Sequence, residues 1–254
     1  MITIRIIPVL FLIILLPAIT AGQQTQFETA NTLMEDYQFT EALEYYRSIE
    51  DRGYHSGELF FNMGLASLYQ DSLGLAKSYF MQSSRYRETS AEARSALDYL
   101  ESRFEQRSAV LPQLPWERFF NWIDTRFGTG LMGALSLLFL NTGIALLIAG
   151  WFYTERAFWL KIGSRVLLAS ALLFFLVTLY LSWNNHRYSD AVTIDARAHL
   201  YEQPQVSATP SGTAYEGFAM RVNNPKSADA SGWLYVRLEN GRYGWIEANR
   251  VRTF

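Results

Sequence analysis

Apolar residues along this chain are gathered into blocks rather than spread evenly. The first block, residues 6–16, follows Arg5 and is followed by the small residues 20–22. This is the three-part pattern of a secretory signal peptide. We therefore expect residues 1–22 to be a signal peptide that exports the polar segment after it. A retained N-terminal anchor helix is the alternative, although the apolar run is short for a membrane span.

The next two apolar blocks predict membrane-spanning helices. No charged residue occurs in residues 127–154, and residues 131–152 hold eleven Leu, Ile or Phe side chains. The other block, residues 166–186, is rich in Leu and Phe and ends in polar residues. Each block is long enough to cross the hydrocarbon core of a bilayer. We place the first span at residues 128–153 and the second at residues 166–186.

The segment between the two spans, residues 154–165, is basic. It carries Arg156, Lys161 and Arg165 against one acidic residue, Glu155, and an excess of Lys and Arg marks the cytoplasmic side of a membrane protein. This predicts a two-pass protein of the inner membrane with a cytoplasmic loop. Both large polar segments then lie on the periplasmic side, which is also where a signal peptide sends the N-terminal part.

The polar segment after the first block repeats with a period of 34 residues. Ala30 matches Gly64, Ala42 matches Ala76, and the aromatic pair at 45–46 matches the pair at 79–80. Small residues at fixed positions let two helices of a hairpin approach closely, while the aromatic residues fill the space against the next helix. A further helix is expected at residues 91–106, where apolar residues recur at helical spacing.

These positions, with the turn at residues 36–42, resemble the tetratricopeptide (TPR) family. The resemblance implies an α-helical TPR solenoid at residues 23–107 that has about two and a half repeats, so the array either packs on something else or is marginally stable alone. In such arrays the first helix of each hairpin lines a concave surface. Alternatively, the apolar residues expected there pack between helices as core and bind no partner. The candidate partner-binding residues of this groove are Asn31, Met34, Phe61, Leu65, Leu68 and Tyr69.

Residues 108–127 join the array to the first span. A Pro-containing linker is followed from Trp116 by mixed aromatic and charged residues at helical spacing. This pattern fits an interfacial helix lying on the membrane surface. Alternatively, these aromatic residues belong to the end of the first span at the membrane–water interface, where aromatic residues are enriched. Both interpretations fit equally well.

After the second span the periodicity changes to that of strands. Five short strands are expected within residues 191–254, with Asn240-Gly241 as a hairpin turn between two of them. A domain of about this size with short strands suggests a small all-β barrel. Within it we expect Gly244 to allow close backbone approach and Trp245 to anchor the core.

The run from Gly232 to Ile246 resembles the bacterial SH3 (SH3b) signature. In that signature W-x-x-V is followed by a D/N-G turn and a G-W-[VI] strand. The resemblance implies an SH3-like barrel at residues 191–254. Its exposed aromatic residues either line a partner-binding groove or belong to the edge of a small core; the candidates are Tyr201, Tyr215, Trp233 and Tyr243.

Composition narrows the chemistry of the 254-residue chain. It contains no Cys, which excludes disulfides, Cys-ligated metals, a thiol nucleophile and a lipoprotein anchor. Its three His are scattered, and no phosphate loop or nucleophile elbow occurs. Residues 23–110 carry fourteen acidic and eight basic residues, a net charge of −6 that disfavours nucleic acid. We therefore expect no enzyme, catalytic residue, cofactor or metal.

The whole order of modules is similar to the BatE-type proteins of the Bat aerotolerance operons. This resemblance implies a non-enzymatic envelope protein that acts with von Willebrand A-domain membrane proteins and a MoxR-type ATPase. The sequence thus predicts a multi-domain membrane protein with a TPR solenoid, a two-helix transmembrane hairpin and an SH3-like barrel. Its expected function is that of a membrane-anchored scaffold or adaptor in a stress or aerotolerance complex. Binding of peptidoglycan by the SH3b domain is the alternative.

Overall fold

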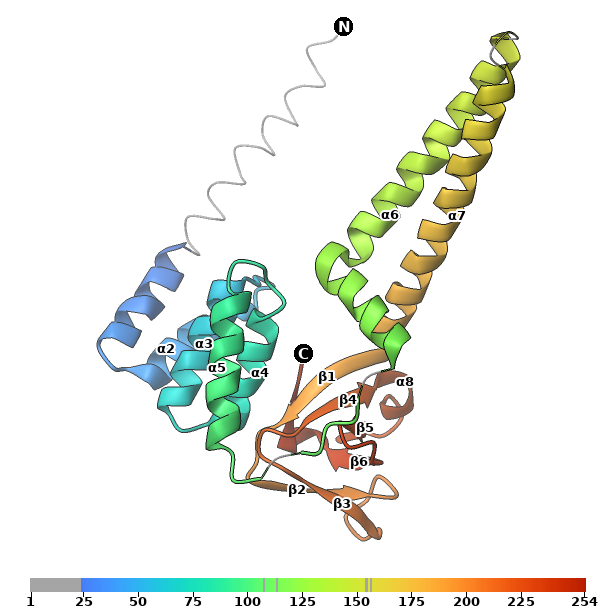
Figure 1. The fold of residues 1–254 in the computed structure, drawn as a ribbon. Coiled ribbons are helices and arrows are strands. Elements are labelled where there is room, and N and C mark those ends of the chain that lie inside the picture. Colours follow the sequence, from blue (N-terminus) through green and yellow to red (C-terminus); the bar gives the residue numbers. More distant parts are fainter. Residues whose placement is uncertain (1–23, 107, 113, 154, 156) are drawn as a thin grey trace, which may run out of the picture. The chain divides into compact units, whose positions relative to one another are not determined.

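The computed structural model describes residues 24–254, with residues 107, 113, 154 and 156 excepted (Figure 1). The predicted signal peptide, residues 1–22, lies outside the described residues. The described chain divides into two compact units. One unit contains the N-terminal helices and the C-terminal sheet, and the other contains two long apolar helices.

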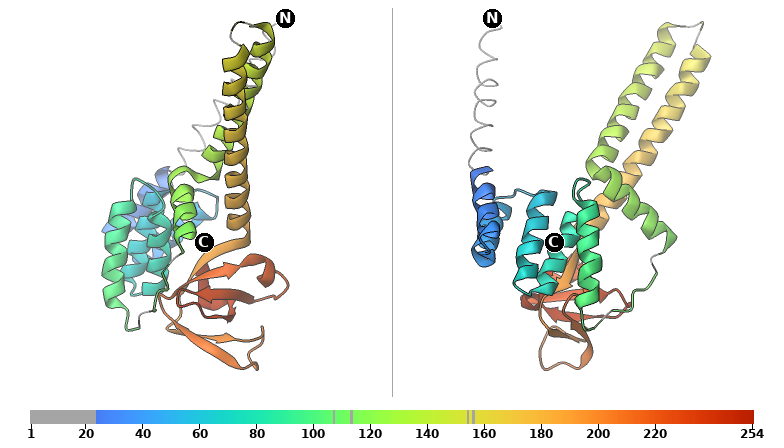
Figure 2. Two further views of the ribbon diagram at one scale, coloured as in Figure 1. Left: turned by 45° about the vertical axis from the view of Figure 1, so that its right-hand side comes forward. Right: turned by 60° about the vertical axis from the view of Figure 1, so that its left-hand side comes forward.

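The N-terminal helices form a stack of antiparallel hairpins, which we call the helical array. Residues 24–35 are helical and are followed by α2 (Phe39–Glu50), α3 (Gly57–Tyr69), α4 (Leu73–Ser83) and α5 (Ser90–Arg103). Both views of Figure 2 show α3, α4 and α5 running side by side. The helix at residues 91–106 that the sequence predicts corresponds to α5.

The 34-residue period is present in the backbone of the array. Tyr37 and Asp71 both have positive φ, 61° and 57°, at the turns that precede α2 and α4. After each of these residues an amide donates to the carbonyl five residues earlier, Gln38 to Leu33 and Ser72 to Ser67. This is the Schellman arrangement that ends a helix. The two hairpins therefore repeat in geometry as well as in sequence.

The small residues of the period lie where helices meet. Ala42 and Ala76 are fully buried, and a Cβ at Gly64 would collide with the Phe80 ring. Tyr46 and Tyr79 are also fully buried. The steric explanation of the period is confirmed for the small residues and for Tyr46, Tyr79 and Phe80, but not for Tyr45, which is 41% exposed.

The apolar helices α6 (Pro115–Phe152) and α7 (Ala157–Arg187) form a hairpin (Figure 1). Both are long and apolar enough to cross a membrane. The helix α7 begins within the segment 154–165 that the sequence assigns to a loop, because the basic residues Lys161 and Arg165 continue the helix rather than break it. The connection between the two helices is accordingly shorter than expected.

Small and hydroxyl residues hold the hairpin together. The Ser136 hydroxyl donates to the Ala171 carbonyl at 3.0 Å, and the Ser164 hydroxyl donates to the Gly143 carbonyl at 2.8 Å. Leu168 lies against Gly143. Such contacts are typical of helix pairs in lipid, where close approach and inter-helix hydrogen bonds replace the hydrophobic effect.

A break in α6 separates the aromatic segment before the first span from the span itself. Gly128 lies inside α6 with φ 67° and ψ 166°, which is not helical. Residues 115–127 therefore form a helical piece of their own, and the Glu117 carboxylate at its start accepts from the Leu114 amide. That this piece lies at the membrane surface stays a prediction.

The C-terminal segment folds into an open, antiparallel seven-stranded sheet, which we call the sheet domain. The strand order is β3-β2-β6-β5-β4-β1-β7, so β3 and β7 are the edges of the hydrogen-bonded sheet in the described chain. The strands are β1 (Tyr188–Thr193), β2 (Arg197–Tyr201), β3 (Pro210–Tyr215), β4 (Ala219–Asn223), β5 (Trp233–Leu238), β6 (Tyr243–Glu247) and β7 (Val251–Thr253), with the short helices α8 (Asn224–Ser227) and η2 (Ala248–Arg250).

The sheet domain contains the five strands expected from the sequence, together with β2 and β3, which were missed. It is an open sheet rather than the small barrel expected, because β3 and β7 stand at opposite ends of the strand order and do not pair. The turn at residues 240–241 joins β5 and β6, with Gly241 at φ 85°. Gly244 allows close approach as expected, because a Cβ there would meet Leu200 and Ser211. The prediction for Trp245 is wrong. Alternation along β6 puts Ile246 in the core, fully buried, and leaves Trp245 half-buried on the opposite face.

Candidate functional site

Three consecutive strands of the sheet domain present aromatic side chains on the face opposite the core. Side chains of β5 alternate between the two faces of the sheet. Val236 and Leu238 are buried in the core, and the outward side chains are Trp233, Tyr235 and Arg237. Strands β2 and β6 alternate in the same way. We call the resulting surface the aromatic face; it consists of Tyr201, Trp233, Tyr235, Tyr243 and Trp245.

The rings of the aromatic face contact one another across the strands. Tyr235 and Tyr201 both lie opposite Trp245 in the strand pairing. The Tyr235 and Trp245 ring centroids are 5.3 Å apart, edge to face, and those of Tyr201 and Trp233 are 5.5 Å apart. Tyr235 also stacks on Tyr243 at 6.3 Å. Cross-strand aromatic pairs of this kind fix ring orientation before a ligand arrives.

Cationic side chains border these rings. The Lys226 ammonium lies 3.2 Å from the Tyr235 ring centroid and 5.8 Å from that of Trp245. The Arg237 guanidinium lies 5.5 Å from the Tyr243 centroid, and Tyr243 is 52% exposed. The face thus places positive charge beside aromatic rings, of which Tyr243 is exposed and the other four are half-buried.

The structure brings together three of the sheet residues proposed from the sequence. Tyr201, Trp233 and Tyr243 all belong to the aromatic face. Tyr215 does not, because it packs on Phe218 beside the core. Sequence analysis missed Tyr235 as a site residue, although its place two residues after Trp233 on a strand would have put it on the same face.

The residues proposed for a groove of the helical array have mixed environments. The Asn31 carboxamide accepts from the Tyr46 hydroxyl at 2.6 Å and from Asn62 at 3.1 Å. Burial raises the pKa of Tyr46 to about 12, so its hydroxyl keeps the proton that it donates. Asn31 is thus part of an internal network. Half-buried packing between helices accounts for four more of the proposed residues, namely Met34, Phe61, Leu65 and Leu68.

Tyr69 is the most exposed of the groove candidates, at 62%. Its ring stacks on Phe39 with centroids 4.6 Å apart, and Tyr37 meets Phe39 edge to face. Tyr37 is 81% exposed. These three aromatic residues gather at the turns of the repeats rather than along the helices.

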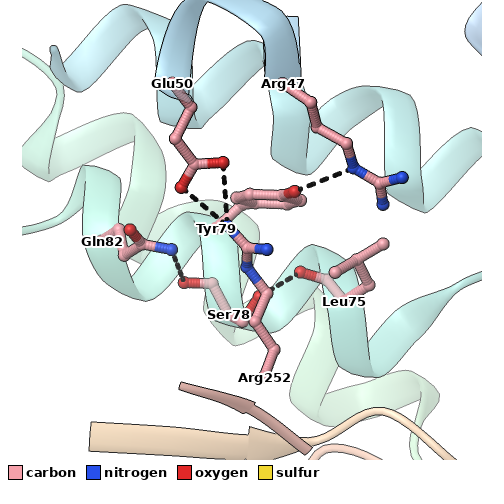
Figure 3. A network of polar contacts seen from close by, with 7 residues as sticks. All are labelled: Arg47, Glu50, Leu75, Ser78, Tyr79, Gln82 and Arg252. Atoms are coloured by element: carbon pink, nitrogen blue, oxygen red, sulfur yellow. Dashed lines mark hydrogen bonds and ion pairs between the residues drawn. The ribbon is translucent and has the colours of Figure 1, made fainter. Parts of the chain in front are cut away.

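The helical array packs on the sheet domain through a set of contacts that we call the array–sheet joint. Arg252 of β7 donates to both carboxylate oxygens of Glu50 at the end of α2, at 2.7 and 3.0 Å. Its guanidinium lies 4.2 Å from the centroid of the buried Tyr79 ring. Figure 3 shows Arg252 reaching from the strand to Glu50 beside Tyr79, whose hydroxyl accepts from Arg47. Burial raises the pKa of Tyr79, and the positive charge of Arg252 opposes that shift.

Further contacts extend the joint along α4. The Gly74 amide donates to the Glu216 carboxylate at 2.7 Å, and a Cβ at position 74 would collide with the Thr193 carbonyl. The Arg85 guanidinium pairs with Asp190 at 2.7 Å and lies 5.1 Å from the Phe254 ring centroid. The array therefore packs on something else, which was one of the two possibilities for so short a repeat.

A buried aromatic residue completes the joint. Phe104, which follows α5, is 9% exposed and lies directly against Gly217, whose φ is 78°. Lys77 of α4 lies 5.4 Å above the Phe104 ring and pairs with Glu101. These contacts use α2, α4 and the end of α5, whereas the groove candidates belong to the helix at residues 24–35 and to α3.

Two of the three histidines have local structural contacts. His55 stacks on Phe60, with ring centroids 5.7 Å apart, and His199 lies 3.3 Å from the Thr213 hydroxyl. Within the described residues, no group of three or more His, Cys, Asp or Glu side chains could hold a metal ion.

No protein-family model matches the chain. No curated protein matches it either. The function is therefore inferred from the residues and their geometry.

Proposed function

We propose that the protein is a non-enzymatic scaffold or adaptor of the cell envelope, anchored in the membrane by α6 and α7. The observation that carries the proposal is the aromatic face, where five aromatic side chains in edge-to-face or stacked contact with a neighbouring ring lie outside the core of the sheet domain. Aromatic residues are enriched at protein–protein contacts because each supplies a large, rigid contact area. The helical array supplies a second binding module, in which Tyr37 and Tyr69 are the most exposed aromatic residues.

The modules are assigned to families by resemblance. The recurrence of the turn geometry after 34 residues supports a TPR-type array. The Gly241 turn and the close approach at Gly244 support an SH3b-type domain. With the two apolar helices between them, these modules support a BatE-type protein of a Bat aerotolerance complex. Its partners would then be von Willebrand A-domain membrane proteins.

We place the protein in the inner membrane with the array and the sheet domain on the periplasmic side. Glu50 and Arg252 form an ion pair although the two candidate spans lie between them. Residues in contact must be on the same side of a membrane, and two spans return the chain to the side from which it started. The basic residues between the spans favour the cytoplasm for the connection.

The test is photocrosslinking in native membranes. A benzoylphenylalanine photoprobe replaces Tyr243 in the full-length protein, and the control carries it at Tyr99 of α5, which is equally exposed at 50%. We expect position 243, and not position 99, to crosslink to one or a few membrane proteins. Identification of von Willebrand A-domain proteins among them would support the Bat assignment. Equal crosslinking from both positions, or none from 243, would contradict binding of a partner through the aromatic face.

Peptidoglycan binding is the second candidate function. The aromatic face favours it, because aromatic rings such as the exposed Tyr243 also pack against sugar rings. Full-length protein in detergent is sedimented with purified sacculi, alongside a Tyr243→Ala/Trp233→Ala variant. Sedimentation of the unaltered protein alone would favour wall binding, whereas an adaptor remains in the supernatant.

A further inference from the structure

The first span has a polar side chain that does not face the other helix of the hairpin. Asn141 lies near the middle of the predicted span at residues 128–153, with about 18–20 Å of helix on either side. The face of α6 that meets α7 includes Ser136, Gly143 and Gly150, which are all buried. At about 100° per residue, Asn141 is about 200° from Gly143 around the helix. Its side chain is accordingly exposed.

The carboxamide of Asn141 is only partly satisfied by its own helix. A carboxamide has two N–H donors and an oxygen that accepts hydrogen bonds. One N–H donates to the Leu137 carbonyl at 2.7 Å, while the other N–H and the oxygen make no hydrogen bond with any residue that the structure describes. The neighbouring Thr142 is also exposed, but its hydroxyl uses its single proton on the Leu138 carbonyl at 2.8 Å. Asn141 therefore keeps one donor and one acceptor for a group outside the hairpin.

In a bilayer, these unused groups favour association. The hydrocarbon core holds no water to bind them, so a hydrogen bond from another helix stabilises a polar side chain there. Polar residues within spans therefore usually face protein rather than lipid. Ser136 and Ser164 follow this rule inside the hairpin, because each donates to a carbonyl of the facing helix. Asn141 can follow it through a second molecule.

We propose that a second copy of this chain packs on this face of α6, with the two Asn141 side chains hydrogen-bonded to each other. A carboxamide complements itself, because an N–H of each can donate to the oxygen of the other. Copies inserted in the same direction present Asn141 at the same depth, and a two-fold axis normal to the membrane brings the two residues together. A second copy thus supplies the matching polar group. The inference rests on the membrane anchor of the proposed function and adds its state of association.

Residues around Asn141 allow two helices to approach each other. Ala145 and Ala134 lie within about 40° of Asn141 around the helix, and both are exposed. Small side chains at these positions leave room for a second helix, as is usual where spans pack closely. The larger exposed side chains Leu140 and Leu147 lie about 100–120° to one side of Asn141. They would remain in contact with lipid in the dimer.

The first test measures self-association of the full-length protein by sedimentation equilibrium in detergent micelles. We expect a monomer–dimer equilibrium whose dissociation constant rises about tenfold in Asn141→Leu. Asn141→Gln, which keeps the carboxamide, should stay close to the unaltered protein. Thr142→Val is the matched control and should leave the constant nearly unchanged, since the hydroxyl is already bonded within the helix. A monomer at every concentration, or equal effects of Asn141→Leu and Thr142→Val, would overturn the proposal.

Disulfide crosslinking locates the interface in native membranes. The chain has no Cys, so single cysteines are introduced at Ile148, about two turns from Asn141 on the same face, and at the adjacent Leu147. Both side chains are exposed, at 44% and 37%. We expect Ile148→Cys to give a disulfide-linked dimer on mild oxidation, Leu147→Cys to give far less, and Asn141→Leu to reduce the dimer of Ile148→Cys. Equal crosslinking at positions 147 and 148 would overturn this face as the interface.

The outcomes distinguish this inference from the adaptor function. Release of the protein from membranes by alkaline carbonate would contradict the anchor, and with it both the dimer and a membrane-anchored adaptor. An inserted monomer whose position 243 still crosslinks to a partner would leave the adaptor function in place and overturn the dimer. A disulfide from Ile148→Cys to a different membrane protein, in place of a self-dimer, would make that protein the occupant and overturn the second copy.

Discussion

Gly217 and Gly232 share a backbone torsion, with φ 78° at each, but not their surroundings. A Cβ at Gly217 would collide with the Phe104 ring, whereas nothing lies within 4 Å of one at Gly232. Substitution by Ala at either position carries the cost of a left-handed conformation, about 1 kcal/mol. At Gly217 the collision with Phe104 adds roughly 1–3 kcal/mol.

We therefore expect Gly217→Ala to lower the free energy of unfolding by more than Gly232→Ala does, and to loosen the array–sheet joint. Denaturant unfolding of both variants, followed by tryptophan fluorescence, measures the difference. Equal losses in the two variants would mean that Phe104 moves aside without cost, and that it does not hold the joint.

The stability of the protein should depend on pH through Glu239 of the sheet domain. Burial raises the pKa of the Glu239 carboxyl above its usual range, Lys77 partly offsets the shift, and Glu101 and Asp190 add to it. A carboxyl whose pKa is raised in the folded state binds more protons folded than unfolded. The contribution of Glu239 to the free energy of unfolding therefore falls as pH rises. The fall begins near the pKa of the unfolded state, about 4.3, and is complete above the pKa of the folded state.

The variant Glu239→Gln should accordingly stabilise the protein more at pH 7.5 than at pH 4.5. The measurement is the difference in free energy of unfolding between the variant and the unaltered protein at each pH. Glu202→Gln, at an exposed site of the same domain, is the control and should show no such trend. A constant difference across this range would mean that the Glu239 carboxyl does not titrate differently in the two states.

Residue environments were predictable where a strand's alternation could be read. Tyr201, Trp233 and Tyr243 were chosen as exposed aromatic residues, and they do share one face. Trp245 was assigned to the core because large aromatic residues are usually buried. The inward positions of its strand are instead taken by Gly244 and Ile246, and a period of two leaves Trp245 no place beside them.

Among the secondary-structure elements, α2 and β7 are joined by one ion pair. Glu50 and Arg252 retain only 18% and 23% of their side-chain exposure. Removing one partner leaves the other charge largely buried, which costs more than the pair contributes. In a double-mutant cycle of Glu50→Gln and Arg252→Met we expect a coupling energy of about 1–3 kcal/mol.

The cycle of Arg85 and Asp190 is the comparison, because both side chains are nearly half exposed. Their coupling should be well below that of Glu50 and Arg252, about 0–1 kcal/mol. A coupling for Glu50 and Arg252 that is no larger would show that the buried pair does not fasten the sheet domain to the array.

Elements with a strong repeat or a long apolar run were predictable from the sequence, and weak strands were not. The array and both long helices follow from their patterns. Strand β3 begins with Pro210 and contains Gly212, two residues that strands generally avoid. Strand β2 pairs with β6 through Tyr201 and Trp245. These residues are far apart in the sequence, so the local hydrophobic pattern does not predict that they pair.

At the scale of the whole molecule, the absence of Cys from the sequence allows a clean test of topology. Single cysteines are placed at Ser95 in the array, Ser231 in the sheet domain and Phe158 near the start of α7, all exposed and uncharged. A membrane-impermeant maleimide should label positions 95 and 231 in intact spheroplasts. Position 158 should be labelled only after permeabilisation.

The outcome decides between distinct arrangements. Labelling of 95 and 231 on opposite sides would contradict the array–sheet joint, because its partners could not meet. Labelling of position 158 alone in intact spheroplasts would keep the joint but reverse the orientation that the basic residues predict. The joint itself could not be predicted from the sequence, since its contacts connect segments that no local pattern relates.

The joint also sets an order of events during synthesis. Glu50 and Arg252 are 202 residues apart, so at about 5–20 residues per second the helical array waits roughly 10–40 s for its counterpart to be made. Until then the surface around Glu50 and Tyr79 lacks Arg252. A nascent chain with an incomplete repeat array is thus exposed to proteases and to neighbouring chains until both apolar helices and the last strand have been added to it.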